Sequence, residues 1–438
     1  MRQFLFKAAT SLTLIVIVAV AARVAFTIDQ TRKIPPGVLA TAPFDQETGN
    51  IAYSLAVGKG FTNAFRRETG PTAWLTPVYP LIVAGVFRVC GILTERSFFI
   101  LVGLNIVFSA GVCIPIFYAG KRIAGVGVAA AAAWLWALFP NAVMMPFEWI
   151  WDTSLSALLG AGLLWATMKL ADSQQRLRDW CWYGALWGFT LMTNPSLGSL
   201  LPVLLGWAAF CGYREKKVPV MRPILAVAIA VMCCVPWTVR NYSVFHKLVP
   251  LRSNFPLELY IGNNENYGQK RFVWPPTITK ERELLRYFRM GEVAFMEEEK
   301  RKAWEFIRTH AAKEVELTAR RCVAFWGGIA QPWQVFWSTE SLLIRVLLLC
   351  NSLGAIGALG GVVVLFWRKS RYAIPAAAFP LVFPWLYYIT HTSLRYRHPI
   401  DPVVLLLTAV GIGAMLPGRK TGERFGQVPR ASDAGAKV

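Results

Sequence analysis

The sequence predicts an all-α polytopic membrane protein, and three observations lead to that prediction. Of the 438 residues, 55% are hydrophobic and only 16% are charged, whereas a soluble domain carries roughly 25% charged residues. The apolar residues form blocks of about 16–25 residues, the length that crosses a bilayer as a helix. These features exclude a cytosolic enzyme, a secreted disulfide scaffold and a typical nucleic-acid binder. They also disfavour a β-barrel, whose strands would alternate apolar and polar residues.

The apolar blocks predict the membrane-spanning helices in order. The first block, 8–26, follows Arg2 and Lys7. We interpret it as an uncleaved first span because many further blocks follow it. After a polar stretch at 29–72, the later blocks are 98–118, 123–145, 150–170, 180–193, 197–212, 223–239, 342–367, 373–389 and 402–416.

Basic loops predict the orientation of these spans. The net charge is +21, and Lys and Arg gather in short loops at 121–122, 172–178, 214–222 and 368–371 and in the tail from 419. The positive-inside rule assigns all of them to the cytoplasm. The spans alternate consistently only if 74–93, with two prolines and Arg88, is a juxtamembrane or re-entrant segment. We therefore predict about ten spans (10–11, the larger number if 74–93 crosses) and cytoplasmic termini.

The predicted topology divides the chain into four parts. Residues 1–239 form an N-terminal transmembrane module with a first outer loop at 29–96. Residues 240–340 form a second outer loop, in which 280–326 is expected to contain amphipathic helices. The remaining parts are C-terminal transmembrane helices at 341–417 and a cytoplasmic tail at 418–438. The eight cysteines form no Cys-x-x-Cys pair with histidine partners, so neither a disulfide framework nor a metal site is predicted.

Two pairs of acids lie near predicted outer boundaries. Asp45 and Glu47 precede a helical run and either cap that helix or provide a carboxylate that takes a proton from a hydroxyl group. Glu148 and Asp152 are four residues apart, which predicts one helix face at the outer boundary. They either form a structural ion pair with an arginine or line a polar site.

Basic residues lie on the same predicted side, against the usual topological bias. Arg395, Tyr396 and Arg397 precede the last span, with His391 about one turn earlier, and Arg240 ends the span before the second outer loop. Guanidinium groups match phosphate oxygens well, which suggests a lipid-phosphate substrate. Snorkelling of these side chains to lipid headgroups is the alternative.

Several of these residues carry a resemblance to the GT-C superfamily of membrane glycosyltransferases, in particular glycosyltransferase family 39. The matching segments are Glu47 with 51–61, 70–80, Asn194-Pro195-Ser196, Arg240-Asn241-Tyr242 and 395–399. The resemblance implies a GT-C-like bundle with two extracytoplasmic loops. It also implies inverting transfer of a hexosyl or pentosyl unit from a polyprenyl-phosphate-linked donor to an acceptor hydroxyl.

The resemblance also implies roles for the candidate residues. A first-loop carboxylate would be the general base, and Glu47 is preferred over Asp45 because its offset to Ala52, Leu55 and Gly58 matches the family better. Glu148, Asp152, Arg240, His391, Arg395, Tyr396 and Arg397 would bind substrate, with the basic residues holding the departing phosphate. The expected acceptor is a glycan, a lipid or a protein, and the expected location is the bacterial cytoplasmic membrane with the site facing outward. The sequence has no nucleotide or haem motif, does not indicate a divalent cation and suggests no nucleic-acid partner.

Two alternative functions remain open from the sequence. A transporter or flippase of lipid-linked saccharides would show internal symmetry and charges in the middle of its spans. An O-antigen ligase or polymerase-like enzyme would use a similar donor but place its essential residues between Arg252 and Arg289.

Overall fold

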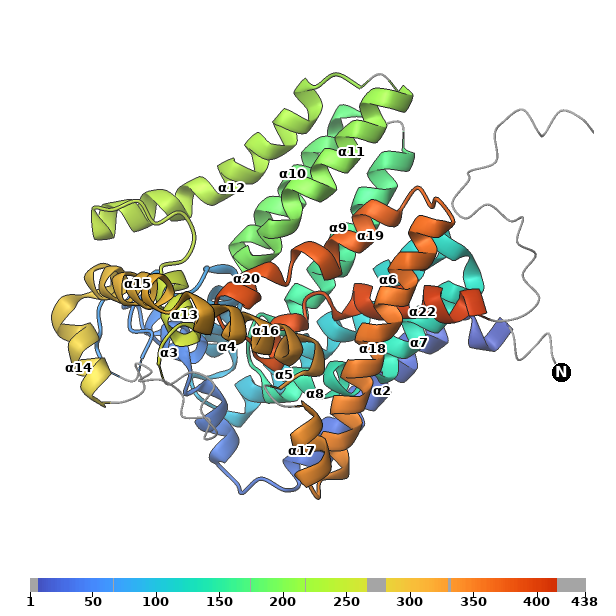
Figure 1. Ribbon diagram of the computed structural model, residues 1–438. Coiled ribbons are helices and arrows are strands. Elements are labelled where there is room, and N and C mark those ends of the chain that lie inside the picture. The colour runs from blue at the N-terminus through green and yellow to red at the C-terminus, as the bar shows by residue number, and fades with distance from the viewer. Residues whose placement is uncertain are drawn as a thin grey trace, which may run out of the picture.

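The computed structural model describes residues 7–415 apart from 66, 174, 217, 266–280 and 330–331. The structure is 79% helix. The described residues form no strand, and their one isolated bridge joins Thr62 to Pro71. The prediction of an all-α fold is confirmed (Figure 1).

Six helical segments are long and apolar enough to cross a membrane. They are α2 (Leu12–Thr31), α5 with α6 (Glu95–Gly111 and Cys113–Ala124), α9 (Thr153–Asp172), η3 with α11 (Pro195–Leu200 and Leu201–Lys216), α12 (Met221–Phe245) and α18 (Leu342–Trp367). Side chains cap several of them, because Ser11, Thr94 and Ser341 each accept a hydrogen bond from a first-turn amide.

The other candidate spans are bent or shorter. Helices α7 (Val126–Leu138) and α8 (Pro140–Glu148) form a seventh segment that bends by 44° at the break before Pro140. Helices α10 (Leu177–Thr193), α19 with α20 (Ala373–Val382 and Trp385–Ile389) and α22 (Asp401–Met415) are shorter. The span count of ten therefore stays a prediction.

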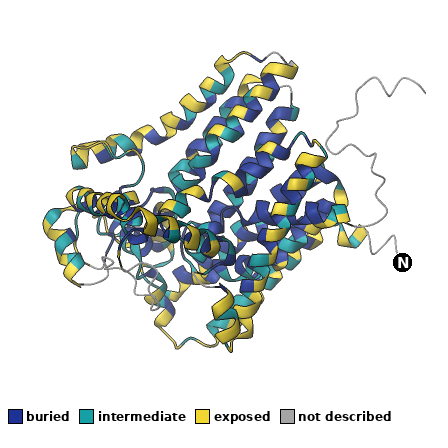
Figure 2. Ribbon diagram, in the orientation of Figure 1, coloured by how far each residue is buried: buried dark blue, intermediate teal, exposed yellow. Residues whose placement is uncertain are grey.

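Helix α22 lies at the centre of the bundle, and residues Asp401–Gly411 are all buried. It packs closely on α18 because that helix has glycines at the contact. A Cβ atom at Gly361 would lie 2.0 Å from the Leu407 carbonyl oxygen, and one at Gly357 would lie 2.5 Å from the Thr408 methyl group. Figure 2 shows buried residues concentrated toward the interior and exposed residues along outer faces such as that of α12.

The predicted cytoplasmic loops meet at one end of the bundle. Arg122, at the end of α6, pairs with Asp172, at the end of α9, at 3.1 Å. Arg371, which follows α18, lies 2.9 Å from Glu215 in α11 and 3.9 Å from Asp172. Loops far apart in sequence thus share one side of the bundle, as the positive-inside assignment requires.

The first outer loop contains two short helices. Helix α3 (Glu47–Ala56) packs against α4 (Val78–Cys90), and Arg88 of α4 donates a hydrogen bond of 2.8 Å to the Leu55 carbonyl. Just beyond α4, Glu95 accepts a 2.8 Å hydrogen bond from the amide of Gly37. The C-terminal end of α4 is therefore tied to the rest of the first loop, and the prediction that 74–93 does not cross the membrane stays a prediction.

The second outer loop covers the first. It contains α13 (Phe255–Gly262), α14 (Glu281–Met290), α15 (Glu292–Thr309), α16 (Ala311–Gly327) and α17 (Pro332–Ser338). A hydrophobic cluster separate from the bundle core joins the two loops. In it, the Tyr287 ring meets Phe65 and Phe295 edge-on, with centroids 5.3 and 5.4 Å away.

Candidate functional site

A cavity of about 410 Å³ lies where the two outer loops meet the ends of the bundle helices. Its walls come from the first loop, the start of α9, the Asn194 turn, the start of the second loop, helix α20 and the segment between α20 and α22. The lining residues are Glu47, Trp74, Trp151, Asp152, Thr153, Asn194, Pro195, Ser196, Pro250, Leu251, Arg252, Asn254, Phe255, Glu258, Leu386, Tyr387, Thr390, Arg395, Tyr396 and Pro399.

Two of the predicted acids, Glu47 and Asp152, line this cavity. Glu47 is the first residue of α3, and Asp152 immediately precedes α9. Burial raises the pKa of both carboxyl groups, and nearby Arg395 and Arg252 oppose that rise. A carboxylate with a raised pKa is a stronger base, so both residues are suited to accepting a proton.

A short chain of hydrogen bonds orients Asp152. The Ser156 hydroxyl donates to Asp152 Oδ2 at 2.8 Å and accepts from Asn194 Nδ2 at 3.1 Å. Asn194 begins the η3 turn, where its side chain also accepts from the amide of Ser196. Asn194, which belongs to one of the segments that carry the resemblance, thus helps to fix a carboxylate of the cavity.

The prediction that Glu148 and Asp152 share one helix face is wrong. Helix α8 ends at Glu148, and Trp149 adopts an extended conformation before α9 begins. Asn105 stabilises this break, because its side-chain amide donates to the carbonyl of Trp149 at 3.2 Å. Glu148 is exposed and does not line the cavity, whereas Asp152 does.

Arg395 lies in a box of aromatic rings at the cavity wall. Its guanidinium carbon is 4.8 Å from the ring centroid of Trp149, 4.6 Å from that of Trp151 and 5.1 Å from that of Tyr396. Within the described part of the chain, no ion pair joins Arg395 to a carboxylate within 4.0 Å. A cation held by aromatic faces at a cavity wall is suited to binding an anionic ligand.

Arg252 and Glu258 also line the cavity, and sequence analysis did not select either as a candidate. The Arg252 Nε donates to the Trp74 carbonyl at 3.1 Å, which places its guanidinium beside the first loop. Glu258 lies in the first turn of α13, where Asn254 Nδ2 donates to its Oε1 at 2.9 Å. In the sequence analysis, only the ligase alternative drew attention to this region, because it would place the essential residues between Arg252 and Arg289.

Besides Glu148 and His391, three predicted site residues lie outside the cavity lining. Arg240 donates to the carbonyls of Thr72 and Phe61, both at 2.7 Å, and so anchors the first loop to α12. Arg397 is buried and donates to Asp401 Oδ1 and the Trp326 carbonyl, both at 2.6 Å. It also donates to Asn351 of α18. Asp45 ends the η2 turn (Ala42–Phe44) before α3.

Glu292 joins the two outer loops behind the cavity. The first residue of α15, it accepts hydrogen bonds from the Thr72 hydroxyl at 2.5 Å, the Ala73 amide at 2.7 Å, the Ser253 hydroxyl at 2.6 Å and the Tyr287 hydroxyl at 2.6 Å. Trp74 and Arg252, the neighbours of Ala73 and Ser253, line the cavity. This buried carboxylate therefore sets the spacing of two cavity walls.

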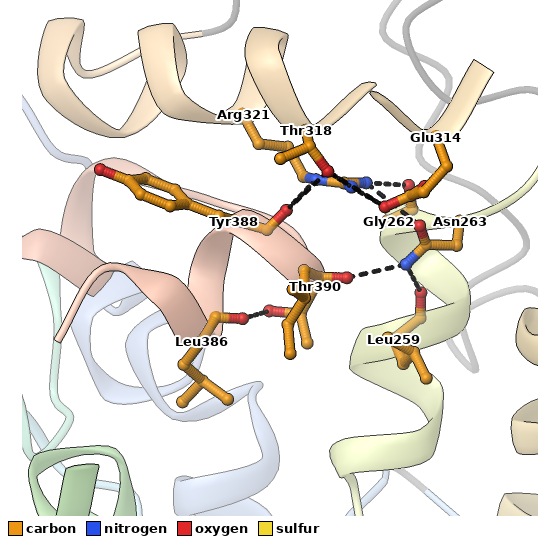
Figure 3. A network of polar contacts seen from close by, with 10 residues as sticks. Leu259, Gly262, Asn263, Glu314, Thr318, Arg321, Leu386, Tyr388 and Thr390 are labelled. Atoms are coloured by element: carbon orange, nitrogen blue, oxygen red, sulfur yellow. Dashed lines mark hydrogen bonds and ion pairs between the residues drawn. The ribbon is translucent and has the colours of Figure 1, made fainter. Parts of the chain in front are cut away.

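A second buried network positions α13, which carries Glu258 (Figure 3). Arg321 of α16 donates to the Gly262 and Tyr388 carbonyls, both at 2.6 Å, and Asn263 Nδ2 donates to the Ile389 carbonyl at 2.8 Å. A Cβ atom at Gly262 would lie 1.8 Å from the Thr390 carbonyl oxygen, so glycine allows this close approach. The network holds Glu258 next to the segment that contains His391.

His391 lies just behind the cavity wall. Its Nδ1 is 3.1 Å from Glu258 Oε2, and its Nε2 is 3.3 Å from the Tyr396 hydroxyl oxygen. The structure therefore brings Glu47, Asp152, Arg395 and Tyr396 into one cavity and places His391 directly behind it. Among the described residues, no group of three or more His, Cys, Asp or Glu side chains could hold a metal ion.

Comparison with known proteins bears on this arrangement. Residues 73–239 match the family model described as dolichyl-phosphate-mannose-protein mannosyltransferase. No curated protein matches the chain by sequence.

Two solved structures of an Archaeoglobus fulgidus oligosaccharyltransferase have a similar fold. The complex with zinc and sulfate has 12% sequence identity and a TM-score of 0.51, with 92% of this chain and 48% of that chain covered. The complex with an inhibitory peptide and a dolichol-phosphate also has 12% identity and a TM-score of 0.51, with 85% and 46% covered. This chain therefore spans about half the length of the structures that it matches, and at this identity the similarity concerns the fold. The family match and the shared fold together confirm the resemblance to GT-C membrane glycosyltransferases.

Proposed function

We propose that this protein is a glycosyltransferase that moves a sugar from a polyprenyl-phosphate-linked donor to an acceptor hydroxyl group, with inversion at the anomeric carbon. One observation carries the proposal: acids from the first half of the chain and arginines from the second half line a single cavity. The transfer needs a base for the acceptor and cations for the leaving phosphate. The archaeal oligosaccharyltransferase solved with a dolichol-phosphate supports this donor class, because dolichol-phosphate is itself a polyprenyl-type phosphate.

In the proposed reaction, Glu47 accepts the proton of the acceptor hydroxyl while its oxygen forms a bond to the anomeric carbon. The bond between that carbon and the phosphate oxygen breaks, and its electron pair leaves with the lipid phosphate. A general base contributes about 10²–10⁴-fold to such a rate. Asp152, held by Ser156, would bind the sugar or acceptor hydroxyl groups.

Arg395 and Arg252 would stabilise the phosphate as its charge grows from one to two. Preorganised cations in a partly dry cavity stabilise such developing charge strongly. The aromatic box fixes Arg395, and the bond to the Trp74 carbonyl fixes Arg252. Little reorganisation is then needed when the phosphate departs.

The proposed location of the cavity follows from the predicted topology. The cavity would open at the outer face of a bacterial cytoplasmic membrane, with the lipid tail of the donor in the bilayer. The acceptor would be a glycan, a lipid or a protein, and the sugar a hexose or a pentose.

The proposal can be tested by the release of polyprenyl phosphate from a panel of polyprenyl-phosphate-linked hexoses and pentoses, in membranes that contain the full chain. We expect Glu47→Gln to lower the rate about 10²–10⁴-fold, and Arg395→Gln to lower it by a comparable factor. Glu68→Gln is the matched control, because Glu68 lies in the same loop but is exposed and pairs with Lys59 on the surface.

Normal release in both the Glu47 and Arg395 variants would overturn the proposed site. Loss of release in Asp152→Asn with normal release in Glu47→Gln would transfer the role of base to Asp152.

A further inference from the structure

The residues Glu258, His391 and Tyr396 form a continuous polar chain at the cavity wall. The distances along it are 3.1 Å from Glu258 Oε2 to His391 Nδ1 and 3.3 Å from His391 Nε2 to the Tyr396 hydroxyl oxygen. Glu258 and Tyr396 line the cavity, whereas only 5% of His391 is exposed. Tyr396 also contributes a ring to the aromatic box around Arg395, but none of the three serves as the base or as a cation in the chemistry proposed above.

The hydrogen-bonding capacity of the three groups allows two arrangements. His391 Nδ1 faces Glu258 Oε2 at 3.1 Å, so we assign the proton of the neutral imidazole to Nδ1. With neutral His391, Nε2 can only accept, and the Tyr396 hydroxyl must donate to it. With protonated His391, Nε2–H donates to the Tyr396 oxygen, and the Tyr396 O–H is free to point into the cavity.

We propose that Glu258, His391 and Tyr396 form a proton-coupled switch that recognises the doubly charged phosphate. Protonation of His391 turns the Tyr396 O–H toward the cavity, where it donates a hydrogen bond to a phosphate oxygen. The inference rests on the glycosyl transfer proposed above and adds to it a means of telling product phosphate from donor phosphate.

The proton balance of the transfer explains why such a switch is useful. The donor is a phosphodiester with one negative charge, and the departing lipid phosphate is a monoester with two. The acceptor proton goes to Glu47, so the net charge of the cavity is unchanged, but one negative charge moves from Glu47 to the phosphate. One proton taken up from solvent by His391 Nε2 adds a positive charge on the phosphate side and turns the Tyr396 O–H toward the phosphate.

The charges around His391 set the direction of this coupling. Glu258 faces it from α13, Arg395 and Tyr396 from α21 (Leu394–Arg397), and Arg321 from α16. Burial lowers the pKa of His391, Glu258 opposes this, and the two arginines lower it further. His391 is therefore neutral near pH 7 in the empty cavity, and a nearby phosphate dianion favours its protonation.

Two small probes separate the charge states. Farnesyl phosphate is a dianion above pH 7, because the second pKa of a phosphate monoester is about 6, whereas its methyl ester is a monoanion at every pH used. Titration calorimetry of the purified full chain between pH 7 and pH 9, in two buffers of different ionisation enthalpy, measures both affinity and proton uptake. We expect uptake of up to one proton with farnesyl phosphate and an affinity that falls by up to about tenfold per pH unit. The methyl ester should show neither effect.

The variants Tyr396→Phe and His391→Asn test the assignment. Both should still bind farnesyl phosphate, more weakly than the wild-type chain at pH 7, with no proton uptake and no dependence on pH. The same uptake in His391→Asn as in the wild-type chain would overturn the switch and leave the phosphate site intact. Failure of the wild-type chain to bind either probe would instead overturn the phosphate site itself, and the proposed function with it.

Discussion

Glu292 accepts a hydrogen bond of 2.5 Å from the hydroxyl of Thr72, which precedes it by 220 residues in the chain. This contact joins the two outer loops, and the same carboxylate also binds Ala73, Ser253 and Tyr287. Trp74 and Arg252, the immediate neighbours of two of these partners, face the cavity. The geometry of the cavity therefore depends on a residue that does not line it.

Replacing Glu292 should loosen the two loops. Hydrogen bonds to a charged group contribute about 1.5–3 kcal/mol each, and Glu292→Ala leaves several buried donors without an acceptor. We expect the packing of the two outer loops to lose at least about 3 kcal/mol of stability, measured as a lower unfolding temperature by tryptophan fluorescence. Glu297→Ala is the matched control, because Glu297 lies on the exposed face of the same helix. Equal unfolding temperatures for the two variants would contradict the role of Glu292.

Substitutions of Arg395 and Arg397 should have different effects, the first on activity and the second on stability. Arg395→Lys keeps the charge but loses the planar group that stacks against Trp149 and Trp151. We expect it to fold normally and to release polyprenyl phosphate more slowly, because Lys cannot replace the planar guanidinium between these rings. Arg397→Leu leaves Asp401 buried without its arginine partner, which typically costs about 3–5 kcal/mol. Chromatographic homogeneity and unfolding temperature should thus fall for the Arg397 variant and stay unchanged for the Arg395 variant, and the reverse pattern would exchange their roles.

The pH dependence of transfer should report the carboxyl group of Glu47. A general base must be deprotonated, so the rate rises with pH through the pKa of Glu47, which burial places above its ordinary value of 4.5. Arg395 lowers that pKa by its charge. Its removal in Arg395→Gln should therefore shift the acid limb of the profile to higher pH, in addition to lowering the rate. An acid limb that does not move in this variant would argue that another group is the base.

The membrane topology gives a prediction that is independent of the chemistry. Arg122, Asp172 and Arg371 lie together, so reporters fused in their three loops must be found on the same side of the membrane. We expect all three, and the C-terminus, on the cytoplasmic side, and a reporter inserted after Glu297 on the outer side. An outward location for Arg122 would overturn both the ten-span count and the proposed direction of the cavity.

The meeting of Glu47 and Asp152 with Arg395 in one cavity could be predicted, because each of these residues lies at or near a predicted span boundary. The contributions of Arg252 and Glu258 could not, since they lie in a loop with no periodic pattern and reach the cavity only through the packing of α13 and the Glu292 contacts. Arg395 and Arg397 could not be separated either. They are two residues apart on a helix of four residues, which is too short for its pattern to show that one faces the cavity and the other the core.

The prediction for Glu148 and Asp152 failed for a related reason. Spacing by four residues implies a shared face only if the helix is continuous, and Asn105, more than forty residues earlier, interrupts it by binding the Trp149 carbonyl. A distant side chain that ends a helix leaves no local signal at the break.

The aromatic box around Arg395 affects how quickly the cavity can be reused. If a carboxylate of the protein were paired with the guanidinium, each incoming phosphate headgroup would have to displace that carboxylate. The ion pair would then re-form each time a headgroup left. The rings of Trp149, Trp151 and Tyr396 hold the cation without a competing negative charge. In the proposed reaction, successive lipid phosphates would therefore exchange at this cation without an ion pair within the protein breaking and re-forming in every cycle.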